Sequence, residues 1–141
     1  VSNSKDIFLA KLDPLGNVVW ARSEGGNMSE NAYGVTVDYN NNVILTGQYQ
    51  GTATIGTNTY TSLIDPMNSQ YSYDLFIAKY DSSGNPLWSI DGKGEYEDRG
   101  LAVAVDDQNN IFCTGQFSKT FQFANNTYNN LGYIIGYLAK I

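Results

Sequence analysis

The chain has 141 residues, enough to bury one core of ordinary size, and its 8 Lys and Arg are outnumbered by 14 Asp and Glu. The net charge of −6 and the pI near 4.3 argue against nucleic acids and anionic membranes as partners, because both select basic surfaces. The absence of histidine excludes serine–histidine and cysteine–histidine nucleophiles and the common zinc sites. The single cysteine, Cys113, excludes an intrachain disulfide and is predicted to be a small buried side chain. No stretch is apolar enough to cross a bilayer, and the lack of a signal peptide leaves a cytosolic, a processed or an excised chain as alternatives.

The first predicted element is a hairpin. Ile7–Leu12 reads as a strand, the sequence DPLGN as a turn, and residues 18–21 as the return strand. In this turn Asp13 accepts hydrogen bonds from nearby backbone N–H groups, and Gly16 permits a positive φ. The polar, glycine-containing residues 23–31 are predicted to be a connection, and residues 92–100 are predicted to be a second connection of this kind.

Four predicted strands separated by turns follow. They cover residues 34–37, 43–49, 75–80 and 86–90. The threonine-rich stretch between the second and third strands is predicted to form a small hairpin that turns near residues 56–58, with loop beyond it.

The same order of elements then repeats. The phrase DIFLAKLDPLGNVVW at residues 6–20 returns 68 residues later as DLFIAKYDSSGNPLW at residues 74–88. Strands predicted at 102–105 and 111–117 precede a third, truncated copy at 137–141. A fixed period longer than one hairpin indicates stacked supersecondary units.

Several of the predicted strands are apolar on both faces, as in LFI at residues 75–77 and VIL at residues 43–45. A sheet with one solvated face would alternate instead, so neighbouring sheets are expected to cover both sides. The sequence therefore predicts an all-β fold of β-propeller blades. These would be four-stranded antiparallel sheets, in about two repeat units of about 68 residues.

The two recurring phrases, one ending in GNxxW and one running from VxVD to TGQ, resemble the bacterial β-propeller repeats known as SBBP repeats. The resemblance covers residues 6–141. The family's glycine in the second turn is replaced by Asn41 and Asn109, which are expected to keep the left-handed conformation that this turn requires. The resemblance implies a secreted or cell-surface bacterial β-propeller and no particular activity.

Two sets of aromatic residues are singled out. The repeated positions are predicted to form structural core, although the tryptophans could alternatively stack on sugars: Phe8, Trp20, Phe76, Trp88 and Phe112. The tyrosines of the variable segments are the candidate ligand contacts, because tyrosine combines apolar area with a hydroxyl: Tyr60, Tyr71, Tyr73, Tyr128 and Tyr133.

No catalytic or metal-binding constellation is predicted, and no cofactor. Residues 38–42 begin like a calcium loop, but Val43 stands where such a loop needs glycine and Tyr49 where it needs glutamate. A turn capped by Asp38 is the favoured interpretation. The acidic cluster at residues 95–98 could supply paired carboxylates, but its place in a short polar connection favours solvated charge.

The leading functional hypothesis is a non-enzymatic, secreted or cell-surface propeller segment with a structural, adhesion or assembly role. Its partners would be other blades of a longer chain or copies of itself. The alternative is a lectin-like propeller that binds a glycan or a surface protein through its tyrosine- and asparagine-rich loops. Neither hypothesis involves nucleic acid or membrane insertion.

The number of strands in each predicted blade indicates that the chain joins further blades or further copies of itself. The segments are the C-terminal hairpin of a preceding blade (1–33), a complete blade with an elaborated loop at 51–73 (34–91), and an incomplete blade ending in a third strand (92–141). Two blades cannot close a ring, and uncovered edges attract other strands. We therefore expect either a window onto a longer repeat polypeptide or copies that join into a ring or filament, rather than an isolated monomer.

Overall fold

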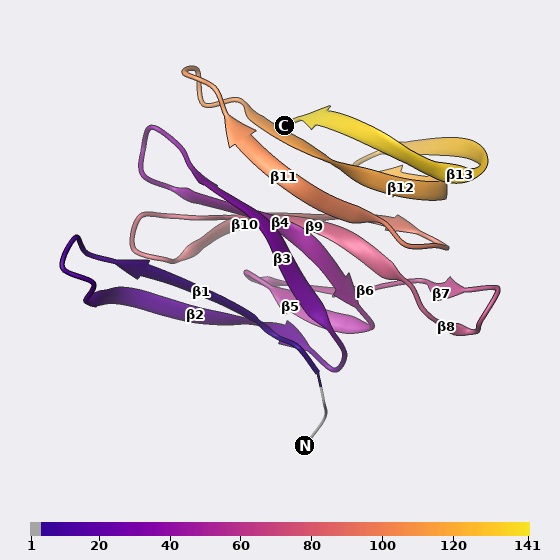
Figure 1. Ribbon diagram of the computed structural model, residues 1–141, viewed down its shortest axis with the longest axis horizontal. Helices are drawn as coiled ribbons and strands as arrows, with labels where there is room; N and C mark the ends of the chain where they lie inside the picture. Colours follow the sequence, from indigo (N-terminus) through magenta and orange to yellow (C-terminus); the bar gives the residue numbers. More distant parts are fainter. Residues whose placement is uncertain (1–3) are drawn as a thin grey trace.

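The computed structural model describes residues 4–141, apart from the side chain of Tyr133. Within these residues every regular element is a β-strand, so the all-β prediction is confirmed (Figure 1). The strands are β1 (Ile7–Leu12), β2 (Val18–Gly26), β3 (Glu30–Val37), β4 (Val43–Gln50), β5 (Thr52–Ile55), β6 (Asn58–Thr61), β7 (Ile64–Asp65), β8 (Gln70–Tyr71), β9 (Tyr73–Tyr80), β10 (Pro86–Gly94), β11 (Arg99–Val105), β12 (Ile111–Phe123) and β13 (Asn126–Lys140).

The strands form three antiparallel blades. The central blade is complete, because β3 pairs with β4, β4 with β9, and β9 with β10. The first blade is the hairpin of β1 and β2, and the last blade consists of β11, β12 and the second half of β13. The central blade lies between the other two (Figure 1). The predicted order of strands within the repeat is therefore confirmed.

A hairpin that follows the second strand of each blade reaches back to the preceding blade. Hairpin β5–β6 turns at Gly56, as predicted, and β5 pairs with the end of β2 through Gly26 and Ala53. One repeat later the far half of β12 pairs with the end of β10 through Gly94 and Phe121. The threonine-rich excursion is thus a joint between successive blades.

Residues 23–31 and 92–100 were predicted to be connections, and this prediction is wrong for most of them. β2 continues to Gly26 and β10 to Gly94, and the next blades begin at Glu30 and Arg99. Glycine is needed there for close approach rather than for turning, since a Cβ on Gly26 would lie 1.9 Å from the carbonyl oxygen of Thr52.

Two apolar cores hold the blades together. The core between the first and central blades contains Ile7 and Leu9 on one side and Phe76 and Ala78 on the other. The core between the central and last blades joins the opposite face of the central blade, with Ile44, Leu75 and Ile77, to residues of β12: Ile111, Cys113, Phe117 and Phe121. Alternate residues of β9 therefore face different neighbours, which explains why this strand is apolar on both faces.

The predicted core aromatics differ in their burial. Phe76 is fully buried, and Trp20, Trp88 and Phe112 are half-buried against their neighbours. Phe8 is the exception: it is 73% exposed, so its assignment to the core is wrong for this chain. Phe8 lies on the face of β1 that points away from the central blade, where no other described strand packs.

The hairpin turns have the predicted backbone. Gly16 and Gly84 have φ of 86° and 85°, and Asn41 and Asn109 have φ of 60° and 63°. The predictions of a positive φ at the glycines and a left-handed conformation at the asparagines are confirmed. Cys113 is buried as a free thiol, as predicted.

Candidate functional site

The tyrosines proposed as ligand contacts lie in different surroundings. Tyr60 on β6 is half-buried, and its hydroxyl lies 2.9 Å from the Ser89 Oγ atom of β10. Tyr71 and Tyr73 flank Ser72 in the elaborated loop and at the start of β9, and both are half-buried. Tyr128 on β13 is 48% exposed and lines a cavity, whereas the side chain of Tyr133 lies outside the described part of the chain.

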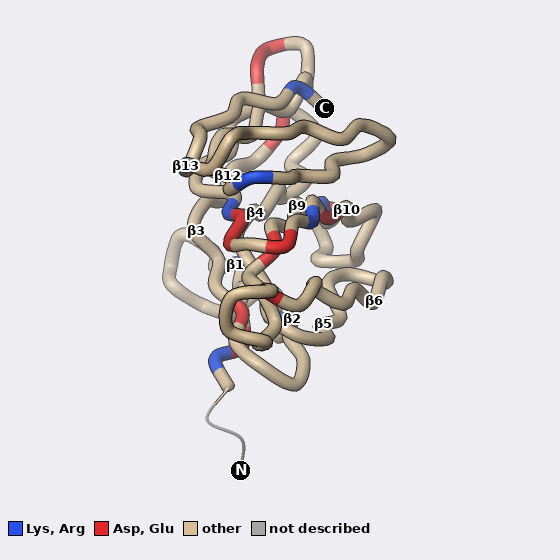
Figure 2. The backbone as a smooth tube through the Cα atoms, turned by 90° about the vertical axis from the view of Figure 1, so that its right-hand side faces the viewer, with Lys and Arg blue, Asp and Glu red and all other residues tan. Residues whose placement is uncertain are grey.

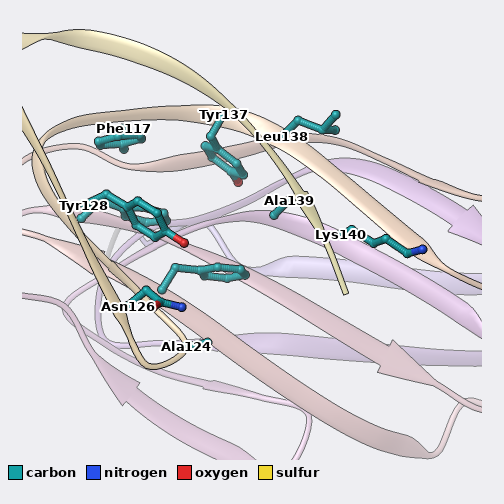
Figure 3. Close-up of a pocket in the computed structure, with 10 residues that line it drawn as sticks. Phe117, Ala124, Asn126, Tyr128, Tyr137, Leu138, Ala139 and Lys140 are labelled. Atoms are coloured by element: carbon teal, nitrogen blue, oxygen red, sulfur yellow. The ribbon is translucent and has the colours of Figure 1, made fainter.

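The cavity next to Tyr128 has a volume of about 390 Å³ and lies in the last blade. Figure 3 shows the rings of Phe117, Tyr128 and Tyr137 gathered between the hairpin that joins β12 to β13 and the final residues of β13, with Leu138 directed away from them. Its lining residues come from both sides of this space: Phe117, Phe121, Phe123, Ala124, Asn126, Tyr128, Tyr137, Leu138, Ala139 and Lys140.

Stacked aromatic rings form one wall of this cavity. The Phe121 ring is central, with its centroid 5.0 Å from that of Phe117, 5.8 Å from that of Phe123 and 5.7 Å from that of Tyr137. Tyr128 tilts toward the same ring at 6.3 Å. Such offset contacts stabilise an aromatic cluster beyond the burial of its area, so the wall is a firm apolar surface.

The corresponding space in the central blade is filled by its own fourth strand. Residues 88–91 of β10 pair there with residues 76–79 of β9, which are the repeat equivalents of residues 137–140. Ser89 fits beneath hairpin β5–β6, where its Oγ donates a hydrogen bond to the Ile55 carbonyl oxygen at 2.8 Å. The cavity in the last blade is thus the place of a fourth strand.

The aromatic wall was not anticipated from the sequence, apart from Tyr128. Its residues follow the repeat: Phe117, Phe121 and Phe123 stand 68 residues after Tyr49, Ala53 and Ile55. Each replacement either removes a hydroxyl or enlarges an apolar side chain. This change between equivalent positions was the available evidence in the sequence.

The segment that begins like a calcium loop is a capped turn. The Asp38 Oδ1 atom accepts hydrogen bonds from the backbone N–H groups of Asn40 and Asn42, both at 2.9 Å. The Oδ2 atom pairs with the Lys79 ammonium at 2.8 Å. Although burial opposes ionisation, these bonds lower the pKa of Asp38 to about 2. The carboxylate is therefore held by the turn and by Lys79.

Buried carboxyl groups occur at equivalent places in both blade junctions. Glu30 lies at the junction of the first and central blades, where burial raises its pKa to about 7 and Asp6 adds to the effect. Asp98, 68 residues later, is fully buried, and burial followed by the charge of Asp74 raises its pKa to about 8. The Asp98 Oδ2 atom has no hydrogen-bond partner in the described structure. Solvated charge was favoured for the cluster at residues 95–98, which is wrong for Asp98.

Charges do not concentrate on one part of the molecule. The acidic positions, red in Figure 2, are spread from the first blade to the far end of the last blade, with basic positions between them. Across residues 4–141, no group of three or more Cys, Asp or Glu side chains is arranged to hold a metal ion. The same residues contain no helix of the length and apolarity that a membrane span requires.

Comparison with known proteins supports the repeat architecture. No protein-family model matches the chain. An uncharacterized WD repeat-containing protein of Acanthamoeba polyphaga mimivirus is 26% identical to it over 124 residues. WD repeats are of the β-propeller type, so the similarity supports a propeller-type repeat in this chain. The match covers 84% of this chain but 9% of the mimivirus protein, so the chain spans less than a tenth of that relative. The narrower resemblance to SBBP repeats stays a prediction.

Proposed function

We propose that this chain is a non-enzymatic segment of a β-propeller-type repeat protein, and that it serves a structural, adhesion or assembly role. An extracellular or cell-surface bacterial location is part of the proposal and rests on the resemblance to SBBP repeats. Proteolysis of intact producing cells would test that location: a surface segment is degraded, whereas a cytosolic marker is protected.

The observation that carries the proposal is the repetition of the blade faces. The central blade packs on the last blade through the face that carries Ile77, and on the first blade through the face that carries Phe76. The last blade has Leu138 in the place of Ile77, and the first blade has Phe8 in the place of Phe76. Leu138 and Phe8 are 72% and 73% exposed. Each outer face therefore exposes an apolar side chain whose equivalent in the central blade is buried against a neighbouring blade. Such a pair of faces suits head-to-tail stacking of further blades.

Mixing two variants tests the stacking. Phe8→Asp places a charge on the apolar outer face of the first blade, and Leu138→Asp places a charge on that of the last blade. Light scattering should give particles larger than 15.5 kDa for the unmodified chain and 15.5 kDa monomers for each variant alone. An equimolar mixture should form a dimer, because each variant keeps the face that the other lacks.

Leu15→Asp is the matched control, since Leu15 is an exposed leucine in a turn and its replacement should leave assembly unchanged. A monodisperse 15.5 kDa particle for the unmodified chain would contradict the proposed assembly role.

Carbohydrate binding is the second candidate, because Tyr128 and Asn126 line a cavity of about 390 Å³. Tyr60 is a poorer contact, since its hydroxyl is engaged with Ser89. On a glycan array, a lectin role predicts binding that Tyr128→Ala abolishes and Tyr60→Phe leaves intact. Equal glycan signals for the Tyr128→Ala variant and the unmodified chain would exclude this candidate.

A further inference from the structure

Two carboxyl groups are buried together at the junction of the central and last blades. Asp74, near the start of β9, and Asp98, just before β11, are both fully buried, and they lie close enough to interact electrostatically. The backbone N–H of Asp98 donates a hydrogen bond to the Tyr73 carbonyl oxygen at 2.7 Å, which holds the two segments together. The residues that contact the pair lie between positions 63 and 120, in the interior of the chain.

No basic side chain among residues 4–141 forms an ion pair with either of these carboxyls. The basic residues nearest in sequence are engaged elsewhere, since Lys93 pairs with Asp91 at 3.1 Å and Arg99 pairs with Glu97. The other charged groups that act on the pair, Asp91 and Glu97, are themselves acidic. Buried charges in proteins are paired or bind metal ions, so this pair needs protons or a cation.

The Asp98 carboxyl is hydrogen-bonded through one oxygen only. Its Oδ1 atom accepts a hydrogen bond from the backbone N–H of Ser118 at 3.1 Å, whereas Oδ2 has no partner in the described structure. A Cβ on Gly94 would clash with both Asp98 Oδ2 and the carbonyl oxygen of Thr120, so these two oxygens lie against the same side of Gly94. Two buried oxygens placed together in this way are stabilised by a proton or a cation between them.

The Asp74 carboxyl lies against Gly94 as well, among further oxygen atoms. Its Oδ1 atom accepts a long hydrogen bond from the Gly94 N–H at 3.4 Å and lies 3.1 Å from Ser72 Oγ. The same hydroxyl lies 3.1 Å from the Leu63 carbonyl oxygen and 3.2 Å from the Gly94 carbonyl oxygen. A hydroxyl has one proton to donate, so acceptors outnumber donors around Ser72.

These oxygen donors suit a calcium ion. Calcium takes about six to eight oxygen ligands from carboxylates, backbone carbonyls and similar groups at about 2.3–2.6 Å, which places neighbouring ligands about 3 Å apart. The oxygens around Ser72 Oγ have this spacing, at 3.1–3.2 Å. Only two of the donors are acidic side chains, and the others are a hydroxyl and backbone carbonyls. Magnesium usually keeps several waters, for which a buried site has less room.

The first junction repeats the pair of carboxyls. Asp6 and Glu30 stand 68 residues before Asp74 and Asp98. A Cβ on Gly25 would lie 2.6 Å from Asp6 Oδ1 and 3.0 Å from Glu30 Oε2, so these carboxyls also converge. The Glu30 Oε1 atom likewise has no hydrogen-bond partner in the described structure. Paired carboxyls are therefore a feature of the blade junction and not of one local contact.

We propose that the junction of the central and last blades binds a calcium ion between Asp74 and Asp98. Ser72 Oγ and the carbonyl oxygens of Gly94 and Thr120 complete its set of ligands. The ion neutralises two buried carboxylates and links β9 and β10 of the central blade to β12 of the last blade. Without the ion, the same carboxyls bind protons. This site is independent of the proposed assembly role and of the stacking of further blades.

Calorimetric titration of the EDTA-treated, desalted chain with calcium chloride tests the site. The titration is done at about pH 8.5, above the carboxyl pKa values of about 7 and about 8, so that protons compete little. We expect saturable binding that loses one equivalent of calcium in Asp98→Asn, because an amide supplies no charge for the ion. Asp107→Asn is the matched control, since Asp107 is an exposed aspartate in a turn and its replacement should leave the titration unchanged.

Thermal unfolding gives a second measurement. Calcium at about 100 times its dissociation constant should raise the midpoint by at least about 5 °C, because the ion binds the folded chain only. This shift should be much smaller for Asp98→Asn and unchanged for Asp107→Asn, and magnesium chloride should not reproduce it.

The outcomes separate this site from the assembly role. Equal calcium titrations for the unmodified chain and Asp98→Asn would overturn the site. If Asp98→Asn does not fold, Ser72→Ala, which removes only a hydroxyl, must lower the calcium affinity by at least about threefold. Absence of saturable binding would show that protons alone neutralise the pair and would also overturn the site, whereas the light-scattering experiment on blade stacking would be unaffected.

Discussion

The two copies of the DxFxAK phrase have nearly the same residues and opposite burial. Phe76 is fully buried in the core between the first and central blades, while Phe8, its equivalent 68 residues earlier, is 73% exposed. Both phenylalanines lie in strands paired with the following strand of their own hairpin. The difference arises because the face of β9 that carries Phe76 meets the first blade, whereas no other blade of the described chain packs on the same face of β1. In a stacked fold, therefore, the neighbouring blade decides burial, and the strand supplies a face of the right kind.

The largest expected effect comes from truncating the two phenylalanines. Phe76→Ala should lower the free energy of unfolding by about 3–5 kcal/mol, because it leaves a cavity in a core. Phe8→Ala should change the free energy of unfolding by less than about 0.5 kcal/mol, because the exposed ring buries little apolar surface. Urea denaturation at low protein concentration measures both. Similar losses for the two variants would mean that the exposed face of the first blade is covered in solution.

The two blade junctions should respond to pH in the same direction. The pKa values of Glu30, about 7, and Asp98, about 8, lie above the usual carboxyl range, so the folded chain binds more protons than the unfolded chain between about pH 4 and 8. The stability that these protonated groups contribute is complete below the unfolded pKa and is lost as pH rises through the folded pKa. The free energy of unfolding should therefore fall from pH 5 to pH 8.5.

Asp98→Asn separates the junctions, because an amide cannot ionise. This variant should remove about 4 kcal/mol of the decline, as an upper estimate, and leave the parts that belong to Glu30 and to Asp74, whose pKa burial raises to about 7. Asp38→Asn provides the contrasting control, since the pKa of Asp38 is lowered and its contribution is lost only toward acid pH. A stability that is flat from pH 5 to 8.5 in the unmodified chain would contradict the burial of these protonated carboxyls.

The smallest effect concerns the two glycine turns, which share a backbone conformation and differ in their neighbours. A Cβ on Gly16 would meet nothing within 4 Å, whereas a Cβ on Gly84 would lie 2.8 Å from the Trp20 ring. Gly16→Ala should cost about 1 kcal/mol from the positive φ alone, and Gly84→Ala about 2 kcal/mol because the indole must also move. Thermal unfolding of the two variants measures the difference, and equal losses would show that the first and central blades are not packed through Trp20.

The local parts of the fold followed from the sequence. The strands and the left-handed positions at Gly16 and Asn41 depend on residues close together in the chain, so the local pattern was sufficient to predict them, and the 68-residue repeat is read directly from two copies of one phrase. The glycines near the blade ends were misinterpreted, since glycine permits both a turn and a close backbone approach. Gly26 could be assigned only once β5 was seen to lie against it.

Sequence alone therefore determined that this protein is an all-β chain of repeated, stackable blades, because hydrophobic periodicity and turn chemistry act within each strand and turn. The tertiary structure decided which copies of a repeated residue are covered, which carboxyl groups are buried, and which side chains, Phe121 and Tyr128 among them, line the cavity in the last blade. These features depend on segments that lie far apart in the chain or in neighbouring blades. A side chain's burial and ionisation follow from the surfaces that enclose it, and the repeat pattern specifies those surfaces only when every neighbour is in place.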